Sequence, residues 1–226
     1  MSSWKQQDFA KDYADNAADV QKNWFEHDLN FPLLLQMLPK DAQRVLDYGC
    51  GPGEFTAQLA KHFAKVDGCD YSDEMIQLAK ANYKGCEFFV WDNLATTPSV
   101  EPYDAIFSKL TLHFIDDLTQ LANGLKPILK TGGLFVFSVP HPFSTIKKVS
   151  DYWVKAPYET EIGSYGMQVT MIHRSLQDYL LPFINNGYAL VDVVEPKISQ
   201  EQAVKYNEPA EKLAYPRRIN LSFKKL

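Results

Sequence analysis

The sequence Val-Leu-Asp-Tyr-Gly-Cys-Gly-Pro-Gly at positions 45–53 decides the fold. A short apolar run that leads directly into closely spaced glycines predicts a buried β-strand, a tight turn and then a helix. In open α/β sheets, the junction between a strand and its following helix lies at the edge where ligands bind. Glycine permits a positive φ at such a turn and lets a ligand approach the main chain closely. The stretch therefore predicts a doubly wound α/β fold that binds a nucleotide-like ligand at this turn.

The spacing of these glycines, G-x-G-x-G, disfavours a dinucleotide. A dinucleotide-binding turn has the spacing G-x-G-x-x-G and holds a pyrophosphate on free N–H groups at the helix N-terminus. Here Glu54 stands at the position of the third glycine, and Pro52 has no N–H to offer. Asp47 and Glu54 would also repel two phosphates. An NAD-dependent oxidoreductase is therefore the less favoured alternative, and the turn suits a ligand with an adenosine part, positive charge and no phosphate.

The composition of the chain indicates a soluble, cytoplasmic, globular protein. Its 226 residues suit one domain, 46% of them are hydrophobic, and the net charge of -5 argues against a nucleic-acid partner. The longest apolar run, around residues 31–35, is too short to cross a membrane. Cys50, Cys69 and Cys86 are isolated, so we expect buried thiols in a reducing compartment and no zinc site. No metal and no membrane partner are expected, and the oligomeric state is left open.

From residue 41 onward, strand-like apolar runs alternate with helical segments, as a doubly wound sheet requires. We expect a seven-stranded, mostly parallel, Rossmann-like sheet with an antiparallel last strand, all in one domain. Its parts are a helical cap at 1–40, a core at 41–140, an insert at 141–174 and a final helix with strands at 175–226. The expected strands are residues 45–48, 65–71, 86–91, 103–108, 134–139, 188–194 and 218–223.

Two prolines mark the end of the regular pattern. Pro140 and Pro142 flank His141 after the fifth expected strand, and two prolines cannot continue a central strand because they remove ladder donors. The segment up to Gly166 is therefore expected to be mixed in structure, and residues 167–173 are expected to be extended.

The chain resembles the class I S-adenosylmethionine-dependent methyltransferases. Their first motif leads from an acidic residue into G-x-G-x-G, as residues 47–53 do. The second half is similar to bacterial members of the methyltransferase type 11 group in the His-Pro-Phe at 141–143, the His-Arg-Ser-Leu-Gln-Asp-Tyr at 173–179 and the Val-Glu-Pro at 194–196. The resemblance covers nearly the whole chain. It implies methyl transfer from S-adenosyl-L-methionine, with S-adenosyl-L-homocysteine as the product.

The resemblance implies cofactor contacts at the ends of three successive strands, at Asp47, Asp70 and Asp92. Asp70 matches the acidic residue that accepts hydrogen bonds from both ribose hydroxyls, a geometry that needs a carboxylate. Asp92 matches the residue that takes the adenine amine, with the Asn93 N–H available to a ring nitrogen. Asp47, together with the carbonyls of the glycine turn, would favour the ammonium and sulfonium charges of the cofactor.

Further implied contacts come from the turn, the adenine side and the fourth strand. Tyr71 and Met75 match positions that cover an adenine face, and Ser108 and Lys109 match positions beneath the methionine part. The full set of implied cofactor residues is Tyr13, Asp47, Gly49, Cys50, Gly51, Gly53, Asp70, Tyr71, Met75, Asp92, Asn93, Leu94, Ser108 and Lys109.

The first forty residues are expected to be helical, with a second apolar helix after Pro32. In the resembled family this segment caps the cofactor pocket, which makes Tyr13 and Phe25 candidate lining residues. The alternative, in which the aromatic stripe is only a packing face, stays open. The apolar residues that recur at steps of three and four are Phe9, Tyr13, Ala17, Val20 and Trp24.

The implied reaction is an in-line displacement at the sulfonium methyl. Its leaving group is already activated, so alignment and desolvation can supply most of the catalysis, and a base is needed only for a protonated nucleophile. His141, held at the ligand edge between two prolines, is a candidate to orient or deprotonate the nucleophile. His113, just past the fourth strand, is the second candidate. Their alternatives are a loop histidine bonded to main chain for His141 and a structural role for His113.

The acceptor is expected to be a small molecule, held under the cap and an aromatic insert around Trp153 and Tyr165. The chain lacks the positive excess that a nucleic acid requires, and residues 108–111 read Ser-Lys-Leu-Thr instead of Asn/Asp-Pro-Pro-aromatic. Two alternatives stay open. One is a non-catalytic module that binds the cofactor, and the other is a methyltransferase that acts on RNA or protein.

Overall fold

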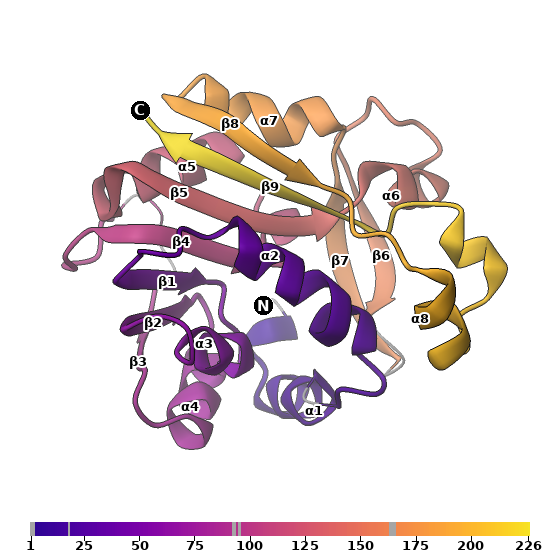
Figure 1. Cartoon of the computed structure of the whole chain (residues 1–226), viewed down its shortest axis with the longest axis horizontal. Helices are drawn as coiled ribbons and strands as arrows, with labels where there is room; N and C mark the ends of the chain where they lie inside the picture. The colour runs from indigo at the N-terminus through magenta and orange to yellow at the C-terminus, as the bar shows by residue number, and fades with distance from the viewer. Residues whose placement is uncertain (1–2, 18, 92–93, 95, 163–165) are drawn as a thin grey trace.

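A seven-stranded sheet in the order β3-β2-β1-β4-β5-β9-β8 organises the computed structural model of the protein (Figure 1). The structure describes residues 3–17, 19–91, 94, 96–162 and 166–226. β1 to β5 run parallel, and β9 is antiparallel to both of its neighbours. The predicted Rossmann-like fold class is therefore confirmed. The strands are β1 (Arg44–Tyr48), β2 (Lys65–Asp70), β3 (Glu87–Val90), β4 (Tyr103–Lys109), β5 (Leu129–Pro140), β8 (Tyr188–Val194) and β9 (Arg218–Lys225).

β1 lies inside the parallel part of the sheet, between β2 and β4. Its Asp47 stands opposite Gly68 of β2 and Phe107 of β4. After β1 the chain adds β2 and β3 on one side and then returns to add β4 and β5 on the other. The strand order therefore reverses between β1 and β4, and such a reversal is where open α/β sheets bind ligands.

Helices cover both faces of the sheet (Figure 1). α2 and α3 pack one face through the fully buried Leu34 and Leu59, and α5 and α7 pack the other through Leu121 and Phe183. α4 packs against β3 through Ile76. This double cover explains why β1 is buried along nearly its whole length. The helices are α2 (Phe31–Met37), α3 (Glu54–Leu59), α4 (Asp73–Asn82), α5 (Leu118–Leu125) and α7 (Leu176–Ile184).

The start of the chain is helical in pieces: η1 (Ser3–Lys5), α1 (Gln7–Ala17) and the π-helical η2 (Phe25–Asn30). The prediction that Val20 belongs to the apolar stripe is wrong, because Val20 lies in a turn after α1 and is 47% exposed. α2 begins at Phe31, before Pro32, since the first turn of a helix does not need the missing proline N–H.

The insert after β5 is more regular than predicted. α6 (Pro142–Val149) begins directly after β5, and β6 (Ala156–Ile162) pairs with β7 (Met167–His173) in a two-stranded antiparallel ribbon. Pro140 is the last residue of β5 and Pro142 lies in the first turn of α6, two positions at which a proline is tolerated. The prolines therefore mark a boundary between elements, and not an irregular loop.

The remaining elements are short, and two sequence expectations need correction. β5 begins at Leu129 instead of residue 134, because Leu129 pairs with Tyr103 ahead of an irregularity in the ladder. Cys50 and Cys69 are buried as predicted, but Cys86 is only partly buried because it precedes the edge strand β3. Within the described residues, no helix combines the length and apolarity that a membrane crossing needs. The short elements are η3 (Leu112–Phe114), η4 (Lys126–Ile128), α8 (Gln200–Lys205) and η5 (Ala210–Leu213).

Candidate active site

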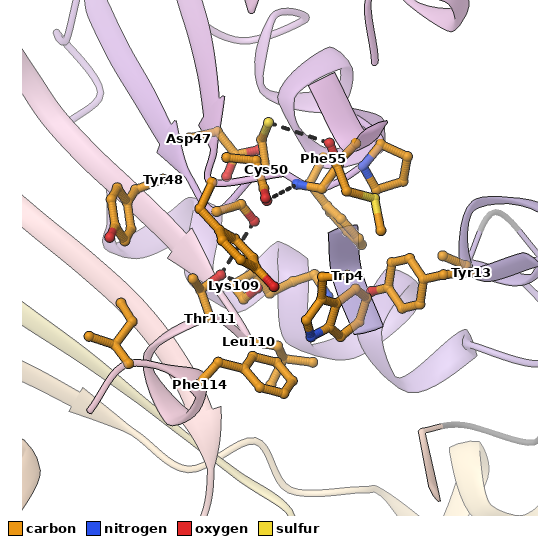
Figure 2. Close-up of a pocket in the computed structure, with 18 of the residues that line it drawn as sticks. Trp4, Tyr13, Asp47, Tyr48, Cys50, Phe55, Lys109, Leu110, Thr111 and Phe114 are labelled. Carbon is orange, nitrogen blue, oxygen red and sulfur yellow. Dashed lines mark hydrogen bonds between the residues drawn. The ribbon is translucent and has the colours of Figure 1, made fainter. Parts of the chain in front are cut away.

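A cleft of about 610 Å³ opens at the carboxyl ends of β1, β2 and β4. Figure 2 shows Asp47 of β1, Cys50 of the glycine turn, Lys109 at the end of β4 and Thr111 after it, with Trp4 and Tyr13 of the cap around the cleft. The described residues that line the cleft are Trp4, Tyr13, Ala17, Asp47, Tyr48, Gly49, Cys50, Gly51, Pro52, Glu54, Phe55, Asp70, Tyr71, Met75, Trp91, Leu94, Lys109, Leu110, Thr111, Phe114, Ile115, Val169 and Thr170.

The three glycines of the turn have different roles. All have positive φ, at +74° for Gly49, +53° for Gly51 and +88° for Gly53. A Cβ on Gly49 would lie 2.2 Å from the Thr111 hydroxyl oxygen, and one on Gly53 would lie 2.9 Å from Ala79 Cβ, so both keep neighbouring elements close. A Cβ on Gly51 would meet nothing nearer than Tyr13, 4.0 Å away across the cleft. Gly51 therefore leaves the main chain open toward a ligand.

Asp70, the last residue of β2, connects the glycine turn to the start of α4 through hydrogen bonds. Its Oδ2 accepts a hydrogen bond from the Gly51 N–H at 2.9 Å, and its Oδ1 accepts one from the Ser72 N–H at 3.0 Å. Burial raises the pKa of Asp70 above its ordinary value, while these N–H groups act in the opposite direction. A carboxylate oxygen accepts more than one hydrogen bond, so both oxygens can still accept from a ligand in the cleft.

Asp47 is the buried acidic group of the cleft, with an exposed fraction of 2%. Its Oδ2 accepts a hydrogen bond from the Thr56 hydroxyl at 2.7 Å. Burial raises the pKa of Asp47 from 3.8 to about 7, although the Thr56 hydrogen bond and the charge of Lys109 lower it. A carboxylate in this position favours a cationic ligand, because a positive charge in the cleft would compensate its desolvation.

A mostly buried group of three charged side chains, the Lys109–Glu26–Arg218 cluster, forms the back of the site. Lys109 Nζ lies 3.6 Å from Glu26 Oε2 and 4.2 Å from the centre of the Phe55 ring. Arg218 Nε donates to Glu26 Oε1 at 2.9 Å, and Asn30 donates to Glu26 Oε2 at 2.8 Å. Burial alone would raise the pKa of Glu26, but Arg218 and Lys109 bring it down to about 2. The cluster therefore holds two cations and one carboxylate at neutral pH.

Comparison with known proteins identifies the family. Residues 45–133 match a family described as a methyltransferase domain. Over 206 residues the chain is 35% identical to malonyl-[acyl-carrier protein] O-methyltransferase 1 of Ilyobacter polytropus, a match that covers 82% of this chain and 72% of that protein. The chain belongs to the S-adenosylmethionine-dependent methyltransferases. S-adenosylmethionine, the cofactor of this family, is the cofactor that the sequence predicted.

Two further proteins from the comparison are similar to this chain. It is 37% identical over 121 residues to trans-aconitate 2-methyltransferase of Streptomyces avermitilis, a match that covers 48% of this chain and 43% of that protein. The crystal structure of an S-adenosylmethionine dependent methyltransferase from Mesorhizobium loti is 26% identical, with a TM-score of 0.69 and coverage of 86% of this chain and 96% of that chain. The chain spans about half the length of several curated relatives that it matches.

Most of the residues that the sequence assigned to the cofactor line the cleft of the methyltransferase. Gly53 and Ser108 do not: Gly53 packs against α4 and β3, and the Ser108 hydroxyl donates to the Tyr48 carbonyl at 2.8 Å inside the sheet. Asp92 and Asn93 lie outside the described residues. Those that line the cleft are Tyr13, Asp47, Gly49, Cys50, Gly51, Asp70, Tyr71, Met75, Leu94 and Lys109.

Phe25 and His141 lie outside the lining of the cleft. Phe25 is buried with Trp24 and Ile198 in a separate apolar cluster under η2, away from the cleft lining. His141 caps α6, because its Nδ1 accepts the Phe143 N–H at 3.0 Å, and its Nε2 lies 2.8 Å from Glu195 Oε1. Both ring nitrogens are thus engaged outside the cleft, so the alternative of a structural histidine describes His141 better than the catalytic hypothesis does.

His113 lines a second cavity of about 250 Å³ that adjoins the cleft. The two cavities share Trp4, Tyr13, Leu110 and Phe114 in their walls. His113 is 2% exposed, and burial together with the charges of Arg218, Arg174 and Lys109 lowers its pKa to about 3. The ring is therefore neutral at pH 7 in the free protein, which favours the structural alternative for His113 over the catalytic one.

Sequence reasoning missed Trp4, Leu110, Thr111 and Phe114. The Trp4 ring lies 5.0 Å from the Tyr13 ring and 5.4 Å from the Phe114 ring, so it joins the cap to the loop after β4. Leu110 has φ +57°, an unusual value for leucine that turns the chain out of β4 into the cleft wall. The one sequence signal for Trp4 was a tryptophan among otherwise polar residues at the start of the sequence. No sequence pattern predicts the positive φ of Leu110.

Proposed function

We propose that the protein transfers a methyl group from S-adenosylmethionine to a small-molecule nucleophile. The observation that carries this proposal is the pair of adjoining cavities, one at the glycine turn and one beside it, which meet at Trp4, Tyr13, Leu110 and Phe114. A transferase needs two sites that share a boundary, because the donor and the acceptor must be held in line. The buried thiols of Cys50 and Cys69 support a reducing, cytoplasmic location.

The residues of the cleft suit the proposed cofactor. When bound, S-adenosylmethionine supplies a methyl group that is already activated by its sulfonium charge. Asp70 would accept from the ribose hydroxyls, and the bare main chain at Gly51 allows close approach. Asp47 would favour the positive charge of the methionine part. Tyr71 and Met75 provide apolar surface for the adenine.

The walls of the acceptor side would serve alignment and desolvation. Trp4, Tyr13 and Phe114 contribute aromatic surface where the two cavities meet. Such surface excludes water and restricts the positions that an acceptor can take, which are the main requirements of a displacement with an activated leaving group. The small volume of the second cavity, about 250 Å³, favours a metabolite over an RNA base with its backbone or a folded protein segment.

The proposal is tested by following labelled methyl groups. The protein is incubated with methyl-labelled S-adenosylmethionine and a cell extract, and the extract is then separated into small metabolites, RNA and protein. We expect the label on a small metabolite. Label on RNA or protein, with none on metabolites, contradicts the proposed acceptor class, and binding of the cofactor without any transfer indicates a non-catalytic module.

A further inference from the structure

The second cavity has a polar, asymmetric lining that a purely apolar acceptor would not require. Its lining includes five residues with polar or charged side chains from η3, α6, β6 and β9: His113, Lys148, Tyr158, Glu161 and Arg218. Lys148 and Glu161 are exposed, have opposite charges and stand at the rim. Arg218 and His113 are the more deeply buried polar groups.

Arg218 brings an excess positive charge to this cavity. Two cations share the one carboxylate of Glu26 in the Lys109–Glu26–Arg218 cluster, and Lys109 belongs to the cofactor cleft. Arg218 uses Nε for Glu26 and Nη1 for the Arg217 carbonyl at 3.1 Å, which leaves Nη2 without a hydrogen-bond partner among the described residues. A mostly buried guanidinium whose Nη2 amino group has no protein partner among the described residues can bind an anion.

His113 supplies the second observation. Its Nδ1 is buried and has no hydrogen-bond partner within the described part of the chain. A neutral imidazole carries one N–H and one acceptor nitrogen, and a buried polar atom without a partner is uncommon in folded proteins. The His113 ring lines the cavity and carries a buried nitrogen that has no partner among the described residues.

We propose that the second cavity is the acceptor site and that the acceptor is a small organic acid whose carboxylate pairs with Arg218. The proposal rests on the proposed methyl transfer. The one Arg218 nitrogen for which the described part of the chain provides no partner, Nη2, suits a single carboxylate, whereas a phosphate monoester carries about 1.5 to 2 negative charges at pH 7. An amine would meet Arg218 and the rim Lys148, with only the exposed Glu161 in its favour. His113 and Tyr158 would contact the same acid through neutral groups.

The acceptor class is tested with a small-metabolite extract that is split by anion exchange into an acid fraction and a non-acid fraction. Each fraction is given to the full-length protein with methyl-labelled S-adenosylmethionine. We expect labelled product from the acid fraction alone, and we expect it to persist after phosphatase treatment of that fraction. Product from the non-acid fraction alone, or loss of product after phosphatase treatment, overturns the organic-acid assignment but leaves the proposed function intact. Absence of product from both fractions contradicts the proposed function as well.

The role of Arg218 is tested with two matched variants, Arg218→Lys and Arg217→Lys. Both keep the charge and lose the planar fork, but Arg217 pairs with Glu208 and does not line the cavity. With the accepted acid, we expect Arg218→Lys to raise KM at least about tenfold while the Kd for S-adenosylhomocysteine and the melting temperature stay close to those of Arg217→Lys. Equal KM values in the two variants overturn the assignment. If Arg218→Lys does not fold, Tyr158→Phe in β6 tests the acceptor site instead. We expect this variant to raise KM for the acid. An unchanged KM would overturn the contact between the Tyr158 hydroxyl and the acid.

Discussion

Asp70 has two roles that a single substitution can separate. Its carboxylate holds the glycine turn through the Gly51 N–H, and we propose that it accepts from the cofactor ribose as well. Asp70→Ala removes up to two charge-assisted hydrogen bonds to the cofactor, each worth about 1.5–3 kcal/mol at most. Affinities for S-adenosylmethionine and S-adenosylhomocysteine should therefore fall at least about tenfold in calorimetric titrations.

The exposed Asp73 in the first turn of α4 offers a matched control for this experiment. Asp73→Ala should leave the affinity for both ligands unchanged, because its carboxylate does not line the cleft. Equal affinities for Asp70→Ala and Asp73→Ala would remove Asp70 from the ribose site. Melting temperatures of both variants show whether the turn itself has survived the substitution.

Asp47 makes the binding of a cationic cofactor depend on pH. Burial raises its pKa to about 7 in the cofactor-free protein, so near that pH the carboxyl is partly protonated. A cation in the cleft lowers this pKa, and binding must then release a proton. The affinity for S-adenosylmethionine is therefore expected to rise as pH increases through about 7. Titration in two buffers with different heats of ionisation counts the released protons.

Asp47→Asn is the control, because an amide can still accept from Thr56 but does not titrate. We expect this variant to lose the proton release and the pH dependence of affinity. A variant that keeps the wild-type slope would assign the linkage to another group. The same raised pKa means that the folded state binds this proton more tightly than the unfolded chain. The Asp47 contribution to stability in the free protein is therefore greatest below pH 3.8 and is lost as pH rises to about 7.

At the scale of elements, His141 joins β5 to α6 by capping the helix. Loss of an N-cap side chain costs about 0.5–2 kcal/mol of stability, so His141→Ala should lower the melting temperature by a few degrees. His141→Asn supplies a preferred cap residue and should restore most of that loss. Thermal denaturation of both variants, together with turnover once the acceptor is known, checks this prediction. Loss of turnover in both variants at an unchanged melting temperature would instead support a catalytic role for His141.

Some elements around the site could be predicted from the sequence, and others could not. The strand-turn-helix at 45–53 and the acidic ends of β1 and β2 are local patterns, and the structure places Asp47, Asp70 and the turn together as expected. The sequence did not predict α6. Pro140 and Pro142 are compatible with an irregular loop as well as with the end of β5 and the first turn of a helix, so the sequence does not distinguish the two structures. The π-helical η2 that turns Glu26 toward Lys109 and Arg218 has no sequence pattern of its own.

For the whole molecule, the cofactor side is more predictable than the acceptor side. The cofactor cleft is built partly from short segments that follow neighbouring parallel strands, so strand ends locate its acidic residues and the glycine turn, although not Trp4 of the cap. The second cavity gathers Leu110, Thr145, Tyr158 and Arg218, which are separated by long stretches of chain and meet only when the insert folds over the sheet. Such a site depends on the packing of β7 against η3, which no local periodicity encodes.

Methyl transfer itself is tested by measuring the amounts of both reaction products by mass spectrometry. Wild-type protein is given S-adenosylmethionine and the acid fraction of a metabolite extract, and S-adenosylhomocysteine and methylated metabolite are measured over time. Methyl transfer predicts that both products appear in equal amounts and exceed the amount of protein, with slower formation in Asp70→Ala at limiting cofactor. Cofactor that binds to the wild-type protein but stays unchanged with every fraction of the extract would contradict methyl transfer by this protein.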